Sequence, residues 1–301
     1  MNKVAILGVF VADTAYRADR MPRMGETILG NSFALGPGGK GSNQAVACAR
    51  VGAETHMITR LGVDDFAGMA RSTWAEAGVI GHVIDTPDSY TGAAYIFVEE
   101  ASGDNAIIIS PGAAALITAA DIEANRDVIE GADVFITQLE QPMDAAMRGL
   151  QIARAAGVTT ILNPAPAAEL PEGMLALCDY VTPNETETAE ITGIPVETEA
   201  DAARAAEALK AAGVGTPIIT LGERGVYLHS HGIVPAFNAG PVVETTGAGD
   251  AFNGGFAAAL ARGETPQAAV RIGCATAGIS VTRPGTAPSM PSWDEVAALL
   301  G

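Results

Sequence analysis

Short apolar runs alternate with longer, alanine-rich segments of helical period along most of the chain. The runs are rich in β-branched residues and predict buried strands, whereas the segments between them predict helices. The predicted strands are Val4–Val9, His56–Arg60, Asp133–Thr137, Thr159–Leu162, Tyr180–Thr182 and Pro217–Leu221. The predicted helices are Ser42–Val51, Asp64–Ala77, Met143–Ala156, Glu185–Thr192 and Asp201–Ala211. This order predicts an α/β fold with a mostly parallel sheet flanked by helices, which binds ligands beyond the carboxyl ends of its strands.

Two segments interrupt the alternation of strands and helices. Residues 14–34 and 90–109 read as paired strands, and the second pair turns at Ser102-Gly103-Asp104. We expect both segments to form a small β-sheet lid over the strand ends. The core of the fold is then made of residues 1–13, 35–89 and 110–301.

The chain after Thr245 has a different pattern. It is almost wholly helical up to Gly301, with one break at Arg283-Pro284-Gly285. No low-complexity linker or internal repeat separates independent domains. We therefore expect one α/β unit that carries the lid.

Charge and cysteine usage restrict the partners and the compartment. The 301 residues carry a net charge of −18 with a pI near 4.5, which repels nucleic acid and anionic membranes unless a basic patch overrides it. Arg17, Arg20 and Arg23 lie close in sequence but read as solvated side chains rather than a phosphate clamp. The opening apolar run is broken by Gly8 and is too short for a membrane span. Three cysteines without metal-ligand spacing suit a reducing cytosol, so we expect a cytoplasmic protein that binds neither nucleic acid nor membrane.

The strongest chemical signal is Thr245-Thr246-Gly247-Ala248-Gly249-Asp250 ahead of a predicted helix. Glycines before a helix let several N–H groups point at one spot, where the helix dipole also favours negative charge. Asp250 would oppose an anion bound there, unless its carboxylate accepts a hydroxyl proton beside a transferring phosphoryl group. The alternative is that Asp250 is a helix N-terminal residue stabilised by the dipole.

A second glycine-rich stretch runs from Gly36 to Gln44 into a helix. It is not a Walker A loop, because Ala34 stands where the first glycine would be. Asn43, on the first helical turn, could bind the hydroxyls of a small polar ligand. Lys40, in the same turn, is one of few lysines in the chain.

Two acids follow predicted strands. The first strand carries no GxGxxG pattern, which excludes a dinucleotide site, and runs instead towards Asp13. Glu140 has a similar place after the strand that ends at Thr137. Each carboxylate could accept bonds from vicinal hydroxyls, and each alone could equally be a solvated or helix-capping acid.

Asn184 and Glu187 lie three residues apart after Pro183, so both can face one side of a first helical turn. Such a pair suits hydrated Mg²⁺, which takes few protein oxygens. The same spacing also fits a capping box, with Asn184 as N-cap and Glu187 as its partner. Both interpretations remain open on the sequence.

Together these motifs resemble the ribokinase branch of the PfkB carbohydrate kinase family. The matching segments, between Val4 and about Pro291, are Gly25-Glu26-Thr27, Gly38-Gly39-Lys40-Gly41-Ser42-Asn43-Gln44-Ala45, Gln138-Leu139-Glu140, Asn163-Pro164-Ala165-Pro166-Ala167, Thr182-Pro183-Asn184-Glu185-Thr186-Glu187, Thr220-Leu221-Gly222, Gly247-Ala248-Gly249-Asp250 and Val281-Thr282-Arg283-Pro284-Gly285. The second and fourth segments resemble ribokinases more closely than fructokinases or phosphofructokinases. This favours an unphosphorylated pentose as substrate.

The resemblance implies a kinase that transfers the γ-phosphate of ATP to the 5-hydroxyl of D-ribose, giving ribose 5-phosphate. It implies a β/α core with a β lid, often dimeric through the lid. The catalytic residues would be Asp250 as base and Gly247, Ala248 and Gly249 as anion hole. The sugar would be bound at Val11, Asp13, Gly39, Lys40, Asn43, Glu140 and Asp250. ATP would be bound at Asn184, Thr220, Gly222, Gly225, Gly249 and Cys274.

The resemblance also implies two cations. Mg²⁺ would lie near Glu187, through water, and an activating K⁺ would lie beside the anion hole. The residues matching the K⁺ site are Glu244, Thr246, Ser280, Arg283, Gly285 and Ser289, several of them acting through carbonyl oxygens.

Three positions depart from the family pattern. Val11 replaces the usual asparagine, Glu244 replaces an aspartate, and Cys274 stands where a histidine or asparagine commonly borders the adenine. Val11 leaves open another pentose, deoxyribose or a nucleoside as substrate. A non-catalytic sugar-binding regulator is a further alternative, but it would be expected to lack the base or the glycines, and this chain has both.

Overall fold

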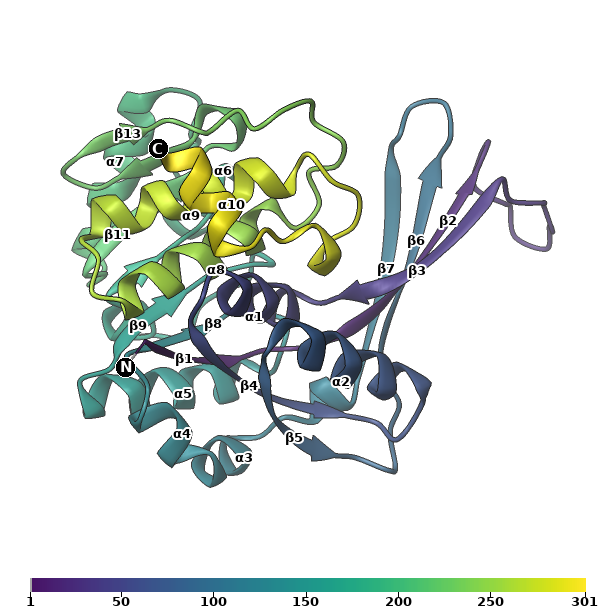
Figure 1. Ribbon diagram of the computed structural model, residues 1–301, viewed down its shortest axis with the longest axis horizontal. Coiled ribbons are helices and arrows are strands. Elements are labelled where there is room, and N and C mark those ends of the chain that lie inside the picture. The colour runs from purple at the N-terminus through teal and green to yellow at the C-terminus, as the bar shows by residue number, and fades with distance from the viewer. Residues whose placement is uncertain (1) are drawn as a thin grey trace.

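The computed structural model describes residues 2–301, and its main feature is a sheet of nine strands covered on both faces by helices (Figure 1). The strand order is β13-β12-β11-β10-β9-β8-β1-β4-β5. Neighbours from β11 to β5 pair in parallel, whereas β12 and β13 are antiparallel. The strands are β1 Lys3–Leu7, β4 Glu54–Leu61, β5 Ile80–Asp85, β8 Val134–Thr137, β9 Thr159–Leu162, β10 Tyr180–Val181, β11 Thr216–Thr220, β12 Val226–Leu228 and β13 Gly232–Val234.

Helices form two layers around this sheet. One layer contains α1 Lys40–Arg50, α2 Asp65–Ala77, α8 Ala248–Ala261, α9 Pro266–Ser280 and α10 Trp293–Leu300. The other contains α3 Ala119–Ala124, α4 Arg126–Glu130, α5 Met143–Ala156, α6 Glu185–Thr192 and α7 Glu199–Ala211. Short 3₁₀ turns lie at Ala113–Leu116, Leu175–Leu177, Gly222–Arg224 and Ala287–Ser289.

The apolar runs of the sequence are continuous because the central strands are buried on both faces. In β1, Val4 and Ile6 pack in the layer of α1 and α8, while Ala5 and Leu7 pack in the layer of α5. All four side chains are fully buried. A parallel strand between two helical layers has no solvent face, so polar alternation is absent.

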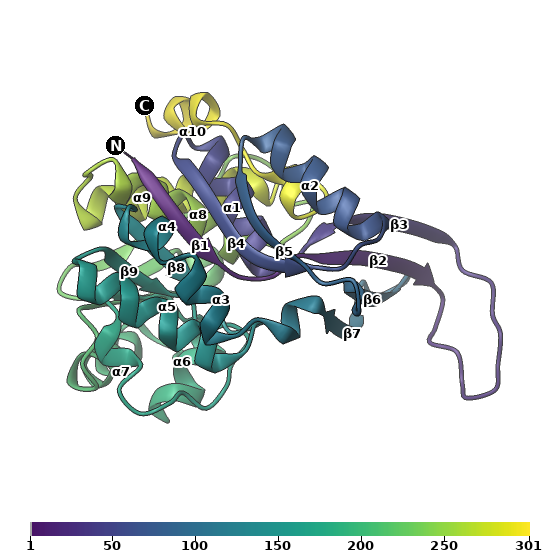
Figure 2. The same cartoon turned by 90° about the horizontal axis from the view of Figure 1, so that it is seen from below.

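A second sheet of four strands, in the order β3-β2-β6-β7, projects from one side of the molecule (Figures 1 and 2). Its strands are β2 Val11–Ala18, β3 Ser32–Gly38, β6 Thr91–Glu99 and β7 Asn105–Gly112. They extend beyond the predicted segments 14–34 and 90–109, because β2 begins at Val11, β3 ends at Gly38 and β7 ends at Gly112. The first part of the glycine-rich stretch, Gly36-Pro37-Gly38, therefore pairs with β2 as strand. Pro37 is accommodated because β3 is an edge strand.

The helical end of the chain is interrupted over a longer stretch than predicted. α9 ends at Ser280 and α10 begins at Trp293, so the break extends well beyond residues 283–285. The intervening segment holds a 3₁₀ turn and lies beside the start of α8. Within residues 2–301, no helix is long and apolar enough to cross a membrane.

Candidate active site

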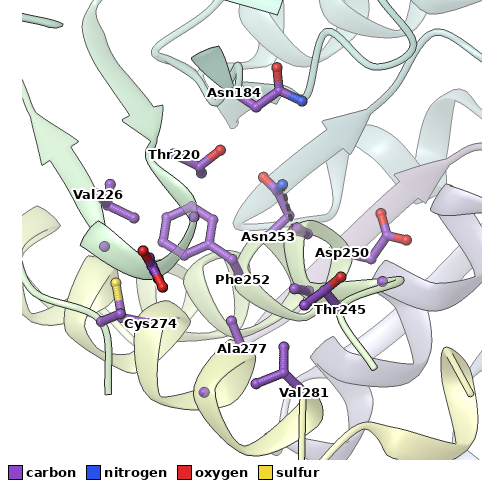
Figure 3. Close-up of a pocket in the computed structure, with 18 of the residues that line it drawn as sticks. Asn184, Thr220, Val226, Thr245, Asp250, Phe252, Asn253, Cys274, Ala277 and Val281 are labelled. Atoms are coloured by element: carbon purple, nitrogen blue, oxygen red, sulfur yellow. Dashed lines mark hydrogen bonds between the residues drawn. The ribbon is translucent and has the colours of Figure 1, made fainter. Parts of the chain in front are cut away.

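A cavity of about 680 Å³ opens at the carboxyl ends of the central strands (Figure 3). The N-terminus of α8 forms one end of it, where Gly247, Gly249 and Asp250 line the wall. Figure 3 shows Cys274 and Val226 on the side away from Asp250. The cavity thus joins the predicted anion hole to the predicted nucleotide residues.

The glycine turn before α8 has the geometry that its sequence predicts. Gly247 is the N-cap with φ 81°, a left-handed conformation that favours glycine. In the described part of the chain, no side chain caps this helix end. The Ala248 N–H donates to the Thr245 carbonyl oxygen at 3.1 Å and closes the turn. A helix start without a side-chain cap, facing a cavity, is suited to an anion.

Asp250 lies in the first turn of α8, and only 6% of its surface is exposed. Its two carboxylate oxygens accept from side-chain amides of α1: the Asn43 Nδ2 at 3.0 Å and the Gln44 Nε2 at 3.1 Å. Burial raises the pKa of Asp250, while the charge of Lys40 and the two amides oppose that rise. A buried, oriented carboxylate with a raised pKa is suited to accepting a proton.

Two further amides, those of Gln138 and Asn163, hold the Gln44 side chain in place, and the sequence motifs gave neither of them a role in the site. The fully buried Gln44 also donates to the Asn163 Oδ1 at 3.1 Å and accepts from the Gln138 Nε2 at 2.6 Å. Gln138 and Asn163 directly follow β8 and β9, which are adjacent in the sheet. Their positions after neighbouring parallel strands were the available signal.

The predicted sugar-side residues also meet at this end of the sheet. Glu140 Oε2 accepts the Lys40 N–H at 2.8 Å, and the Asp13 carboxylate lies against Gly38, where a Cβ would be 2.1 Å from the Asp13 Oδ2. Gly39 caps α1 with φ 86°, and a Cβ there would lie 2.6 Å from the Val9 carbonyl oxygen. Gly38 therefore allows the chain to pass close to Asp13, and Gly39 allows α1 to begin against the backbone of Val9.

The charges at the site are dominated by carboxylates. Burial, followed by the charges of Asp250 and Glu244, raises the pKa of Asp13 to about 6. Burial raises the pKa of Glu140 to about 7 in spite of Lys40. Burial alone would lower the pKa of Lys40, but Asp250, Glu140 and Glu187 raise it overall. One lysine thus stays charged among several acids that share it.

Val11 has no polar role in this arrangement. Its side chain is 3% exposed and belongs to an apolar cluster that includes Ala94, Ile117 and Leu139. Since Val11 and Asp13 are two apart in β2, their side chains leave the strand on the same face. The valine therefore replaces a potential hydrogen-bonding group next to Asp13 with an apolar one.

The pair Asn184 and Glu187 forms the capping box that was one of its two interpretations. The Asn184 N–H donates to Glu187 Oε2 at 2.9 Å, and the Glu187 N–H donates to Asn184 Oδ1 at 2.8 Å. Both residues also line the cavity. Burial raises the pKa of Glu187. The cap is thus present, and the metal interpretation stays a prediction.

The remaining predicted nucleotide residues line the same cavity: Thr220, Gly222, Gly225, Gly249 and Cys274. Gly225 has φ 98°, and a Cβ there would lie 2.2 Å from the Val234 carbonyl oxygen. Cys274 is buried, and with Phe252, Ala277 and Val281 it makes this part of the wall apolar. Such an apolar wall suits the flat face of a nucleobase better than the charged phosphates of a nucleotide.

The residues that match the K⁺ site lie around the break between α9 and α10. The Gly285 N–H donates to Glu244 Oε2 at 2.7 Å, so the longer glutamate reaches this segment. The Ser280 hydroxyl donates a hydrogen bond to the Ala277 carbonyl oxygen, and the Ser289 hydroxyl donates one to the Thr286 carbonyl oxygen. Arg283 is ion-paired with Glu295. Thr246 lies in the exposed turn ahead of α8.

The raised pKa of Glu140 gives a stability prediction. Between its ordinary value and about pH 7 the folded chain binds more protons than the unfolded chain, so this residue lowers stability as pH rises through that window. We expect Glu140→Gln, which keeps the acceptor for Lys40, to be more stable than the parent at pH 8 by on the order of 1–2 kcal/mol, or ~2–4 °C. The difference should vanish near pH 4.5.

Thermal unfolding of both proteins across this pH range measures the effect. Glu76→Gln, an exposed change on α2, is the matched control. A Glu140→Gln protein that is no more stable than the parent at pH 8 would contradict the account of this carboxylate.

Comparison with known proteins places the chain in a family. The model of the pfkB family of carbohydrate kinases matches residues 1–293. The chain is 36% identical to a ribokinase of Haemophilus influenzae, over 99% of this chain and 98% of that protein. It is 34% identical to a deoxyribokinase of Salmonella typhimurium, over 97% and 96%. The structure of Arabidopsis thaliana ribokinase complexed with ribose and ATP superposes with a TM-score of 0.92 at 30% identity, over 99% of this chain and 98% of that one. The chain therefore belongs to the pfkB family of carbohydrate kinases and has its ribokinase-like α/β fold.

Proposed function

We propose that this protein is an ATP-dependent kinase that phosphorylates the 5-hydroxyl of D-ribose. The observation that carries the proposal is the buried Asp250 carboxylate, held by two amides at the open start of α8 and facing the cavity. The ribokinases among its full-length relatives, and the likeness to a ribokinase that holds ribose and ATP, support ribose as the sugar.

In the proposed reaction the sugar lies between Asp13, Glu140 and Asn43, whose oxygens accept its hydroxyl protons. The buried Oδ1 of Asn43 has no hydrogen-bond partner among the described residues, so a sugar hydroxyl would supply the missing donor. Gly39 and Lys40 shape the same side of the site. This arrangement leaves the 5-hydroxyl beside Asp250.

Asp250 then takes the proton of the 5-hydroxyl while the oxygen of that hydroxyl attacks the γ-phosphorus. A new oxygen–phosphorus bond forms, the bond to the β-phosphate bridging oxygen breaks, and ADP leaves. The N–H groups of Gly247, Ala248 and Gly249 bind the negative charge of the transferred group, and the Ala248 N–H shares its hydrogen with the Thr245 carbonyl oxygen. The rest of ATP occupies the cavity along Asn184, Thr220, Gly222, Gly225 and Cys274.

A divalent cation would offset the charge of ATP at this acidic site. Within residues 2–301 no group of three or more His, Cys, Asp or Glu side chains is arranged to hold a metal ion. Glu187 and Asn184 do offer oxygens at the cavity wall, which suits Mg²⁺ that is held mainly by water and phosphate.

A monovalent cation fits the donor set behind the anion hole. Glu244 supplies a carboxylate, and the hydroxyl of Ser289 keeps its lone pairs because it acts as a donor to Thr286. Carbonyl oxygens of Thr246, Ser280, Arg283 and Gly285 are the other proposed ligands. When bound, K⁺ would hold the turn that presents the Gly247–Gly249 N–H groups.

A second candidate substrate is deoxyribose or another pentose, because Val11 puts an apolar side chain on the same face of β2 as Asp13. A deoxyribokinase is among the full-length relatives. A site without a partner for one hydroxyl discriminates less strongly against a sugar that lacks it.

We further propose that two copies pair through the lid. The face of the small sheet opposite Asp13 exposes Tyr16, Phe33, Leu35 and Ile108, which are 41%, 57%, 45% and 68% exposed. Tyr16 and Phe33 lie together there, with ring centroids 5.0 Å apart. A contiguous exposed apolar sheet face is typical of an interface.

We also propose that the protein is cytoplasmic.

Asp250→Asn tests the function directly. The amide keeps the shape of the side chain but cannot accept the proton, so kcat should fall by ~10²–10⁴ or more. Ribose and ATP binding, measured by calorimetry, should stay within a few-fold of the parent. Near-normal turnover of the purified variant would sink the assignment.

Val11→Asn tests the substrate. Restoring an amide beside Asp13 should raise the ratio of kcat/KM for ribose over deoxyribose by about tenfold. The ratio is measured with both sugars in both proteins. A ratio that does not move would show that Val11 does not influence sugar choice.

Metal dependence separates the two proposed cation sites. Replacing K⁺ by choline should lower kcat by about tenfold. This is less than the ~10²–10³ that the loss of one anion-hole donor costs, because the donors remain but are less well positioned.

Glu187→Gln should raise the Mg²⁺ concentration for half-maximal activity and leave the ribose KM little changed. Equal rates in both salts would mean that the Glu244 site needs no cation, and an unchanged Mg²⁺ titration would leave Glu187 as a cap only.

The pairing proposal predicts an oligomeric state. The parent should sediment as a dimer, and Phe33→Asp should shift it towards the monomer by placing a charge in the apolar face. Val63→Asp, an exposed valine outside this sheet, is the control. A parent that is monomeric at micromolar concentration contradicts the proposal.

A further inference from the structure

The segment from Gly285 to Met290 is attached to three parts of the molecule. The Gly285 N–H bonds to Glu244, just before the anion-hole turn. Arg50, the last residue of α1, donates to the carbonyl oxygens of Pro288 and Met290. The hydroxyl of Thr286 donates to the carbonyl oxygen of Pro37 at 2.8 Å. The segment thus bridges the anion-hole loop, α1 and the strand β3.

Thr286 is the residue of this segment that reaches both sides of the site. Its side chain is 7% exposed. On one side it packs against Gly247, where a Cβ would lie 3.3 Å from both the Cβ and the Cγ2 of Thr286. On the other side its hydroxyl donates a hydrogen bond to the Pro37 carbonyl oxygen. One short side chain therefore contacts the N-cap of α8 and the base of the small sheet.

Pro37 is close to the proposed sugar site. It is followed by Gly38, against which the Asp13 carboxylate lies, and by Gly39, the N-cap of α1. It also pairs with Ala12, the neighbour of Asp13 on β2. A sugar bound by Asp13 and the start of α1 would fix the backbone that carries the Pro37 carbonyl group.

We propose that Thr286 is a positioning residue that couples sugar binding to the anion hole. The proposal rests on the proposed kinase function. A sugar bound at Asp13 fixes Pro37, the Thr286 hydroxyl follows Pro37, and the side chain sets the position of Gly247 at the phosphate end of the cavity. The two substrates should then bind cooperatively, because each favours the same placement of this one side chain.

Two substitutions isolate the hydroxyl. Thr286→Val keeps the shape of the side chain and its contact with Gly247 but removes the bond to Pro37. Thr286→Ser keeps the hydroxyl and the Cβ that faces Gly247. Thr282→Val is the matched control, because among residues 2–301 the Thr282 hydroxyl bonds only to the Ile279 carbonyl oxygen, at its own helix end.

Calorimetry gives the affinity of a non-hydrolysable ATP analogue with Mg²⁺, with and without saturating ribose. We expect ribose to tighten binding in the parent by about 5–10-fold, within the usual range of such couplings. Thr286→Val should reduce this factor to about twofold or less, while Thr286→Ser and Thr282→Val keep it. Because coupling is reciprocal, the ribose KM of Thr286→Val at saturating ATP should rise by about the factor of coupling that is lost, while its affinity for ribose alone stays within about twofold of the parent. A general loss of folding would appear as a lower Tm and weaker binding of each ligand alone.

The outcomes distinguish a failure of the proposed substrate from a failure of the proposed role of Thr286. A parent that binds the nucleotide but not ribose would overturn the proposed substrate. A parent that binds both without cooperativity, or a Thr286→Val variant that keeps the full coupling, would overturn the role of Thr286 and leave the kinase proposal intact.

Discussion

The burial of the Asp250 carboxylate at the start of α8 is the constraint on which the site depends. A buried acid needs donors, and the amides of Asn43 and Gln44 reach it because α1 and α8 lie very close. That approach requires Gly254, where a Cβ would lie 2.5 Å from the Ala47 Cβ and 2.7 Å from the Gln44 carbonyl oxygen. Glycine inside a helix costs about 1 kcal/mol relative to alanine. Here the cost is offset by the contact that orients the base.

The site also concentrates negative charge at some expense to stability. Asp13 and Glu140 have raised pKa values because they are buried near Asp250, and for Glu140 the charge of Lys40 offsets only part of that rise. A sugar can donate hydroxyl protons to these carboxylates, so bound substrate supplies what the free fold lacks. In a chain of net charge −18, phosphates are then best bound by backbone N–H groups and cations rather than by further lysines.

Local sequence signals predicted the parts of the fold that have strong periodicity. The bounds of α5, β9 and α6 are those expected, and the glycine turn before Asp250 was identified from its motif. The strand β5 was missed because it mixes polar and apolar residues, and the hairpin of β12 and β13 was missed because each of its strands has only 3 residues. The amides of Gln44, Gln138 and Asn163 meet across 94 and 119 residues of sequence, so only the order of strands in the sheet brings them together. For Asn184 and Glu187 the sequence left two interpretations because the same side chains can cap a helix and face a ligand.

The central claim is that Asp250 accepts the proton of the attacking hydroxyl while the start of α8 binds the transferred group. A crystal structure with ribose, ADP, Mg²⁺ and aluminium fluoride, which imitates the phosphoryl group in transit, tests this most directly. The account predicts the 5-hydroxyl within hydrogen-bond distance of the Asp250 carboxylate and in line with the fluoride complex, whose ligands meet the N–H groups of residues 247–249. A sugar bound with its 5-hydroxyl turned away from Asp250, or a fluoride complex remote from this helix end, would contradict it.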